Sequence, residues 1–429
     1  MSRSLDHPPL LRHRGRHLSG WLTGSLIALA CGPGHAQQSP YYLSLSQQLS
    51  YDSNLFRVPD GASEQSDVIS TTSVTVGVDQ PIGRHRVFGA ASASRTLYRD
   101  NNDLDSSGYD VSLGANVEAT SRLSGSARIG ASRRQASFSN YGALTGTTSG
   151  RNLEDARTAD LRIQYGGASI LVLEGLANYN EVEYSATGFG TRDHRLHMFG
   201  GGLRYQPGGP WTLGLTVRRT NGEYPSFAAN LADEYDRTDV DLVATYTPTG
   251  ASRITARLTK TKEDHDLDTS RDFNGVTGEV RWDYQVTGKV TLGVNVVRDT
   301  GSGSSGYTVV PPSGSVPPGS EPTLSYLTDS RLSNRFGLDA RWAATAKVVA
   351  GARLDYSRDR YDSSFVGGSG DSRGSTRSFR LTVDYTPTRV WLVQCGLGYE
   401  QRTSDVVVGG LDYEYSANTG FCSVTLRLQ

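Results

Sequence analysis

The amino-acid sequence predicts an all-β fold, a transmembrane antiparallel up-and-down β-barrel of about 18 strands, within a range of roughly 16 to 20. Three observations lead to this prediction. Apolar and polar residues alternate over many segments, the alternation repeatedly ends in an aromatic residue before a tight turn, and short connections take turns with long polar ones. Together they are typical of bacterial outer-membrane barrels, in which each strand has one lipid-facing and one water-facing side.

The alternation is clearest in two segments that end in the same kind of turn. One apolar face ends in Tyr246 before Thr247-Pro248-Thr249, and another ends in Tyr385 before Thr386-Pro387-Thr388. The other apolar residues of these faces are Val240, Leu242 and Ala244 in the first segment and Phe379, Leu381 and Val383 in the second. Because an amphipathic ring is stable at the level of lipid headgroups, an aromatic at the end of an apolar face marks a membrane boundary.

The same pattern, followed along the chain, predicts each strand in turn. The expected strands are residues 41–51, 67–79, 85–99, 108–119, 123–137, 156–166, 169–183, 194–206, 211–221, 237–247, 251–262, 275–286, 289–298, 332–343, 347–357, 376–386, 389–402 and 415–429. An even number of strands puts both ends of the barrel on the periplasmic side.

The connections between these strands assign the two sides of the membrane. Short ones such as 247–250 and 386–388 alternate with long, polar ones such as 52–66, 221–236, 299–329 and 358–375. Barrels of this class have short periplasmic turns and long extracellular loops. The composition is compatible with a barrel, because a barrel needs only one apolar face per strand and only 36% of the residues are hydrophobic. The sequence contains no apolar stretch of about 18 residues, the length that a membrane-spanning helix requires.

The first 36 residues have the features of a cleaved secretory signal peptide. Arginines at positions 3, 12, 14 and 16 precede a short apolar stretch, Trp21 to Cys31, and Gly34-His35-Ala36 fits a small-residue cleavage site. We therefore expect residues 1–36 to be removed and residues 37–429 to form the barrel. Cleavage after Ala36 also removes Cys31, which leaves two cysteines.

These two cysteines, Cys395 and Cys422, lie in the last two predicted strands on the lipid-facing side. If the hairpin is centred near Gly409, they fall opposite each other and close enough to form a disulfide. The oxidising periplasm permits the bond. Two free thiols are the alternative, since a slip of one residue in strand register would separate them.

The polar faces of the strands carry many charges, which must point at water inside the barrel because an arginine facing lipid costs about 2–4 kcal/mol at the midplane. The sequence therefore predicts a charged, wet lumen. Two interpretations remain open: the charges hold the wall together as ion pairs, or the arginines form a track for an acidic polymer. The arginines predicted to face the lumen are Arg128, Arg162, Arg204, Arg218, Arg257, Arg281, Arg341, Arg353 and Arg380.

Nothing in the sequence indicates an enzyme, a metal site or a bound cofactor. His194 and His197 are three residues apart, so a strand places them on opposite faces, and no Ser/His/carboxylate arrangement can be assembled. The formal net charge of −1 lacks the basic excess of a nucleic-acid-binding protein.

The first third of the sequence resembles the type 2 family of β-barrel porins, which includes exosortase-associated exopolysaccharide outer-membrane proteins. The resemblance covers about residues 41–110. It is carried by Tyr51-Asp52-Ser53-Asn54-Leu55-Phe56-Arg57 after the first strand, by Ser66-Asp67, by Gly83-Arg84, and by Tyr98 with Leu104-Asp105. It implies a passive outer-membrane conduit for the export of an extracellular polysaccharide, acidic or neutral, working with periplasmic export components.

Two other functions are compatible with the same pattern. One is a general or substrate-selective diffusion porin, and the other is a structural or adhesive barrel whose long loops contact partners. All three place the chain in the outer membrane, in contact with lipid and lipopolysaccharide.

Overall fold

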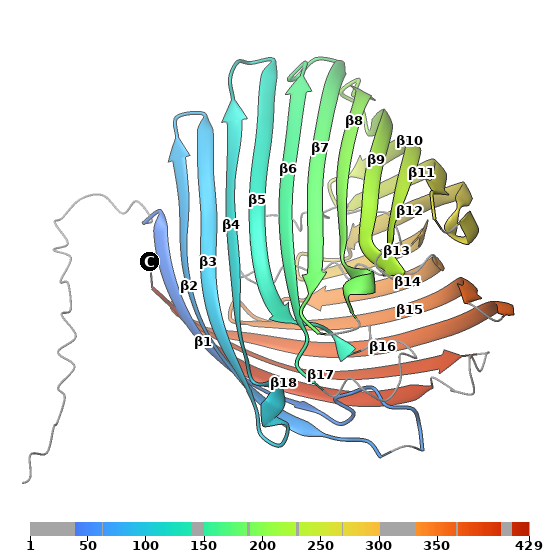
Figure 1. Ribbon diagram of the computed structural model, residues 1–429. Coiled ribbons are helices and arrows are strands. Elements are labelled where there is room, and N and C mark those ends of the chain that lie inside the picture. The colour runs from blue at the N-terminus through green and yellow to red at the C-terminus, as the bar shows by residue number, and fades with distance from the viewer. Residues whose placement is uncertain are drawn as a thin grey trace, which may run out of the picture. The chain divides into compact units, whose positions relative to one another are not determined.

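The computed structural model describes residues 39–428 apart from 62, 139–149, 187–188, 229–230, 268, 301–330, 366–367 and 405–413. The expected signal peptide and most of the predicted 299–329 loop lie outside the described residues. From Ser39 onwards the chain forms one compact unit, and this unit is a single curved sheet of antiparallel strands (Figure 1).

The sheet has 18 strands, as the sequence predicts. Their bounds are β1 (Tyr41–Asp52), β2 (Asp67–Ile82), β3 (His85–Tyr98), β4 (Ser106–Glu118), β5 (Leu123–Gln135), β6 (Leu153–Tyr165), β7 (Leu171–Tyr184), β8 (His194–Tyr205), β9 (Trp211–Ala228), β10 (Leu231–Thr249), β11 (Ser252–His265), β12 (Phe273–Gln285), β13 (Val290–Thr300), β14 (Arg331–Trp342), β15 (Val348–Phe365), β16 (Gly368–Thr388), β17 (Trp391–Ser404) and β18 (Tyr415–Leu428).

The barrel closes because the first strand pairs with two partners. Leu45 of β1 lies opposite Val74 of β2 on one side and opposite Leu426 of β18 on the other. Every other strand pairs with its neighbours in sequence, which is the up-and-down topology. Closure matters because a sheet edge cannot be left unpaired in the hydrocarbon region of a membrane.

Side-chain direction follows the alternation of the sequence. The apolar residues form a continuous belt on the outer surface of the barrel, for example Leu113 at 49% exposed, Leu215 at 52% and Leu258 at 57%. This set of outward apolar residues is called the apolar belt below, and the opposite side of each strand the lumenal face. Exposure of so much apolar surface is explained by contact with lipid.

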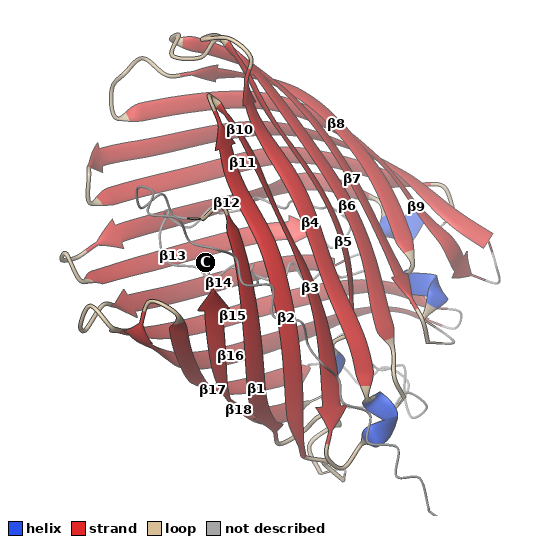
Figure 2. Ribbon diagram, turned by 90° about the vertical axis from the view of Figure 1, so that its left-hand side faces the viewer, coloured by secondary structure: helices blue, strands red, loops and turns tan. Residues whose placement is uncertain are grey.

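The two ends of the barrel differ, as Figure 2 shows, with short turns at one end and short helices at the other. The 3-10 helices within the described residues are η1 (Asn102–Leu104), η3 (Gly190–Arg192) and η4 (Thr269–Arg271). One of the two-residue turns, Gly83-Arg84, uses the left-handed backbone of Gly83 at φ +61°, a conformation that glycine adopts without steric cost. By the rule for such barrels, the short turns face the periplasm.

Two of the predicted long loops are wrong, because their residues extend the strands. β9 and β10 continue through residues 221–236 with only residues 229–230 between them, and β15 and β16 pair as far as Phe365 with Gly368. These hairpins project beyond the apolar belt, where the outward residues of β9 and β10 are polar and several inward ones, such as Asp233 and Arg237, are buried among other polar groups. The apolar alternation used to find strands is therefore lost there although the backbone pairing continues.

Cys395 of β17 and Cys422 of β18 lie directly opposite each other in register. They form a disulfide, with their Cα atoms 4.1 Å apart. The bond joins the last two strands on the lipid-facing side, next to the strand pair that closes the barrel.

A charge placed in the apolar belt should destabilise the barrel. Leu113→Arg places an arginine side chain in contact with lipid near the middle of β4, and we expect this substitution to lower the free energy of unfolding by about 2–4 kcal/mol. The measurement is reversible urea unfolding of the protein folded into phospholipid vesicles. Ser112→Arg is the matched control, because its side chain faces the lumen and should change the stability little; equal effects of the two substitutions would contradict the assigned faces.

Candidate functional site: the lumenal wall

The nine arginines singled out in the sequence analysis all lie on the lumenal face, opposite the apolar belt. They differ in their surroundings. Some are buried in a network of ion pairs on β9–β13, some form ion pairs at the surface of the wall, and some have no carboxylate partner.

The buried network begins with two aspartates of β10. Asp241 accepts two hydrogen bonds from Arg218, from Nε at 2.6 Å and Nη2 at 3.0 Å, and a third from the Thr259 hydroxyl at 2.6 Å. Asp239 accepts from Arg237 Nε at 2.9 Å and from the Thr261 hydroxyl at 2.6 Å. Register explains the contacts, because these residues occupy neighbouring positions on β9, β10 and β11.

Arg237 is the centre of this network and is only 1% exposed. Besides Asp239, its Nη1 donates to Glu263 at 3.4 Å and to the Thr300 hydroxyl at 2.7 Å. Asp299 lies 3.9 Å from its Nη2. A guanidinium surrounded by three carboxylates and a hydroxyl is fully compensated for the loss of water.

The outer end of the network contains a histidine between two acids. His265 Nδ1 lies 2.8 Å from Asp233 and Nε2 lies 3.1 Å from Glu263, with all three side chains fully or almost fully buried. An ionised carboxylate only accepts, so both contacts are hydrogen bonds when the ring is doubly protonated, or when one acid carries a proton.

The loop between β11 and β12 docks on this end through Arg271. Its Nη1 donates to Asp233 at 2.9 Å, and its guanidinium lies over the rings of Tyr224 and Phe227, 4.4 and 4.8 Å from their centroids. The ion pair and the two aromatic faces fix the loop against the outer ends of β9 and β10.

Four of the nine arginines form further ion pairs along the wall. Arg204 lies 3.1 Å from Glu174. Arg353 donates hydrogen bonds from Nε and Nη2 to the two carboxylate oxygens of Asp355, at 2.7 and 2.9 Å. Arg281 lies between Asp283 and Asp339, at 2.6 and 3.4 Å. Arg257 lies 3.7 Å from both Asp241 and Glu279.

Three of the nine arginines have no carboxylate partner among the described side chains: Arg162, Arg341 and Arg380. All three are exposed. Arg380 of β16 lies directly opposite Arg353 of β15, so the register brings two positive charges together. The remaining arginine, Arg128, lies over the ring of Phe88 at 5.5 Å and opposite Asp160 in register.

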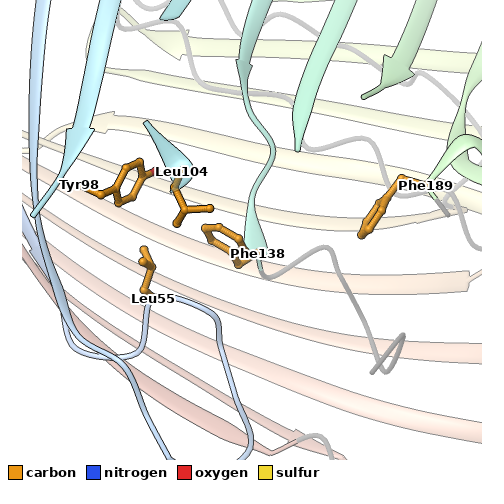
Figure 3. Packing of buried hydrophobic residues seen from close by; sticks show 5 residues of the cluster. All are labelled: Leu55, Tyr98, Leu104, Phe138 and Phe189. Atoms are coloured by element: carbon orange, nitrogen blue, oxygen red, sulfur yellow. The ribbon is translucent and has the colours of Figure 1, made fainter. Parts of the chain in front are cut away.

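Four outer loops contribute to a hydrophobic cluster at the extracellular end of the barrel. It contains Leu55, Tyr98, Leu104, Phe138 and Phe189 (Figure 3). Tyr98 is on β3, and the others lie in the connections that follow β1, β3, β5 and β7. Phe56 joins it with its ring 5.0 Å from that of Phe138. The cluster holds these connections against one another and thereby shapes the outer mouth.

The family-motif residues fasten the first loop across the line of barrel closure. Asn54 is fully buried, and its amide donates to the carbonyls of Val58 and of Ser416 on β18, at 2.9 and 3.1 Å. Arg57 has a left-handed backbone, φ 53°, and Nη1 donates to both Asp52 oxygens at 2.8 and 2.9 Å. Leu55 and Phe56 pack in the cluster, whereas Tyr51 faces outward. These contacts give the motif a structural role.

Sequence reasoning missed the most buried part of the wall. Arg237, Glu263, His265 and Asp233 were assigned to strand ends or loops, because the apolar alternation stops before them. The signal that could have identified them is the period of two in the polar residues themselves, Asp233, Tyr235, Arg237, Asp239 and Asp241.

Comparison with known proteins gives similarity at the level of the fold. No protein-family profile matches the chain, and no curated protein matches it significantly. OpdK of Pseudomonas aeruginosa, in a crystal structure with vanillate, has a TM-score of 0.51 at 12% identity, over 90% of this chain and 99% of OpdK.

Two further solved structures from the same organism are similar to this chain. OccK2 (OpdF) has a TM-score of 0.51 and OccK9 (OpdG) one of 0.50, each at 12% identity and over 90% of this chain and 98% of the other. Such identities establish a shared fold.

The chain is thus a transmembrane β-barrel of the outer-membrane class. Its particular architecture is a closed, antiparallel, up-and-down β-barrel of 18 strands among the described residues, in an environment of outer-membrane lipid and lipopolysaccharide. Among the described residues, no helix has the length and apolar character to cross a bilayer, and no group of acidic, histidine or cysteine side chains there has the geometry of a metal site.

Breaking the buried network should cost far more than breaking an exposed pair. Asp239→Ala leaves Arg237 buried with fewer compensating charges, and we expect the free energy of unfolding to fall by about 3–5 kcal/mol. Asp355→Ala removes the partner of the half-exposed Arg353 and should cost about 0–1 kcal/mol. Urea unfolding in vesicles measures both; a smaller loss for Asp239→Ala than for Asp355→Ala would show that the network contributes no more than a surface pair.

Proposed function

We propose that this protein is a substrate-selective diffusion channel for small carboxylate solutes. The observation that carries the proposal is the group of exposed lumenal arginines without carboxylate partners, Arg162, Arg341 and Arg380. The paired charges of the wall neutralise one another, so these three are available to a solute. Arginine presents a planar fork that matches a carboxylate.

The size of the barrel supports the same proposal. Barrels of about 16–18 strands leave an aqueous channel, and passage through a channel requires binding that is favourable but weak. Exposed arginines in a wet lumen provide such weak contacts, because water screens each charge. Vanillate, found with OpdK in its crystal structure, is a small aromatic carboxylate and a suitable first solute to test here.

Planar bilayers test the channel directly. We expect steady conductance for the purified protein, a reversal potential in a salt gradient that favours anions, and lower vanillate flux after Arg341→Gln with Arg380→Gln. The expected loss is about five- to thirtyfold, since each weak charge contact contributes about 0.5–1 kcal/mol and the variant removes two of them. Outward-facing Arg157→Gln with Arg219→Gln is the control for a mere change of net charge. A silent bilayer, or equal flux in both variants, would exclude the proposed role.

Export of an extracellular polysaccharide is the second candidate. The observation that favours it is the sequence resemblance over residues 41–110, which includes the motif that fastens the first loop to β18. Those contacts concern the construction of the barrel, so they support a shared architecture more than a shared cargo. Periplasmic export components and an acidic or neutral polysaccharide belong to this candidate.

Deletion of the gene separates the two candidates. A conduit for polysaccharide predicts that the deletion strain accumulates polymer in the periplasm and secretes less of it, as measured by sugar analysis of the two fractions. The diffusion channel predicts unchanged secretion together with slower uptake of small carboxylates. Complementation with the Arg341→Gln, Arg380→Gln variant then tests whether the lumenal arginines are needed.

A further inference from the structure

A second group of arginines lies on the outer surface, at the extracellular edge of the apolar belt. In β13, β15 and β16 the first outward residue beyond the belt is an arginine, Arg298, Arg358 and Arg377 respectively. In β6 and β9 it is also an arginine, Arg157 and Arg219. Each of these five positions therefore lies at the extracellular boundary of the apolar residues on its own strand.

On the β5–β10 side, the outward arginines are neutralised by the neighbouring strand. Each has a carboxylate partner within 2.9 Å. The pairs are Arg133 with Asp155 at 2.7 Å, Arg157 with Glu181 at 2.8 Å, Arg195 with Glu223 at 2.8 Å and Arg219 with Asp236 at 2.9 Å. This part of the rim carries little net charge.

On the β13–β16 side, the outward arginines lack such partners. Arg298, Arg358, Arg373 and Arg377, called the arginine patch below, are all exposed, and none of the four forms an ion pair among the described side chains. Arg298 donates to the Val276 carbonyl and the Asn334 side chain, and Arg377 lies over the ring of Tyr356.

Strand register brings the members of the patch close together. Asn334 of β14 lies opposite Arg298 on one side and Arg358 on the other, so these two arginines are two strands apart, about 10 Å. Arg358 lies opposite Ser375, which places Arg373 and Arg377 diagonally next to it, each about 7–8 Å away. Four positive charges therefore occupy one small area of the rim.

The position of the patch decides which anion it meets. It faces outward, so it does not meet solutes in the lumen, and the belt below it, including Tyr356 and Phe379, is in contact with acyl chains. An anionic ligand at this level has its charged groups above the chains of the outer leaflet. Phosphate groups on the glycolipid of that leaflet, lipopolysaccharide, have this geometry, and arginine binds phosphate in bidentate fashion.

We infer that the arginine patch is a binding site for the phosphate groups of lipopolysaccharide, on one side of the barrel only. The paired arginines of the β5–β10 side serve as an internal comparison: the same residue type, on the outer face and next to the apolar belt, with the charge cancelled. The site is independent of what passes through the lumen.

Native mass spectrometry of the full-length purified protein in detergent tests the inference, with bisphosphorylated lipid A as the probe. We expect lipid A to bind, and Arg358→Gln with Arg377→Gln to weaken the binding by about tenfold or more. Arg157→Gln with Arg219→Gln changes the net charge by the same amount and should weaken it less than about twofold. Arg298→Gln is a second, single substitution in the patch, expected to act in the same direction.

Two further arms identify the ligand. Dephosphorylated lipid A should bind about tenfold more weakly than the bisphosphorylated form, and inorganic phosphate alone should bind far more weakly than lipid A because it lacks the acyl chains. Heat-modifiable migration on SDS gels checks that every variant is folded. Equal weakening in the control variant, or equal binding of the dephosphorylated lipid, would overturn the inference, as would tight binding of inorganic phosphate.

Discussion

The whole structure depends on pairing every backbone amide and carbonyl within the membrane. Lipid offers no hydrogen bonds, so a sheet can cross it only when its first and last strands meet. Here that meeting is the β1–β18 pairing, continuous from Leu43 opposite Leu428 to Asp52 opposite Thr419. Three features reinforce the same line: the Cys395–Cys422 disulfide on one side, the Asn54 amide bound to Ser416, and the backbone bond from Ser53 to Asn418.

Closure also fixes what the two faces of each strand must be. Because the outer face contacts lipid, most charged side chains of the spanning strands lie in the lumen, where many of them form ion pairs across neighbouring strands. Arg237 and its three carboxylates show how far this goes. Removal of one charged partner leaves a buried charge without compensation and therefore lowers the free energy of unfolding. Because a slip in strand register would separate the same partners, the network also favours the observed register of β9, β10 and β11.

The sequence predicted the number of strands, most of their ends and the face of each arginine, because all of these follow from a period of two and from turn residues. It did not predict where the β9–β10 and β15–β16 hairpins end, since polar residues beyond the membrane carry no apolar signal. Nor did it distinguish Arg237 from Arg380. That distinction depends on which residue lies opposite: Arg237 has acids in reach on its own strand and the next, whereas Arg380 has Arg353.

Arginine therefore has three roles in this barrel, and the neighbouring strand decides which one applies. An arginine that lies opposite one acid and reaches a second, and is covered by other groups, stabilises the wall, as Arg218 does with Asp239 and Asp241. An arginine opposite a small residue or another arginine, facing water in the lumen, keeps its charge available to a solute, as at Arg380. An arginine in the same situation on the outer rim, such as Arg358, keeps its charge available to the anionic groups of the leaflet. A single residue type thus supports stability, the proposed selectivity and the proposed lipid contact, and the difference lies in cross-strand register rather than in local sequence.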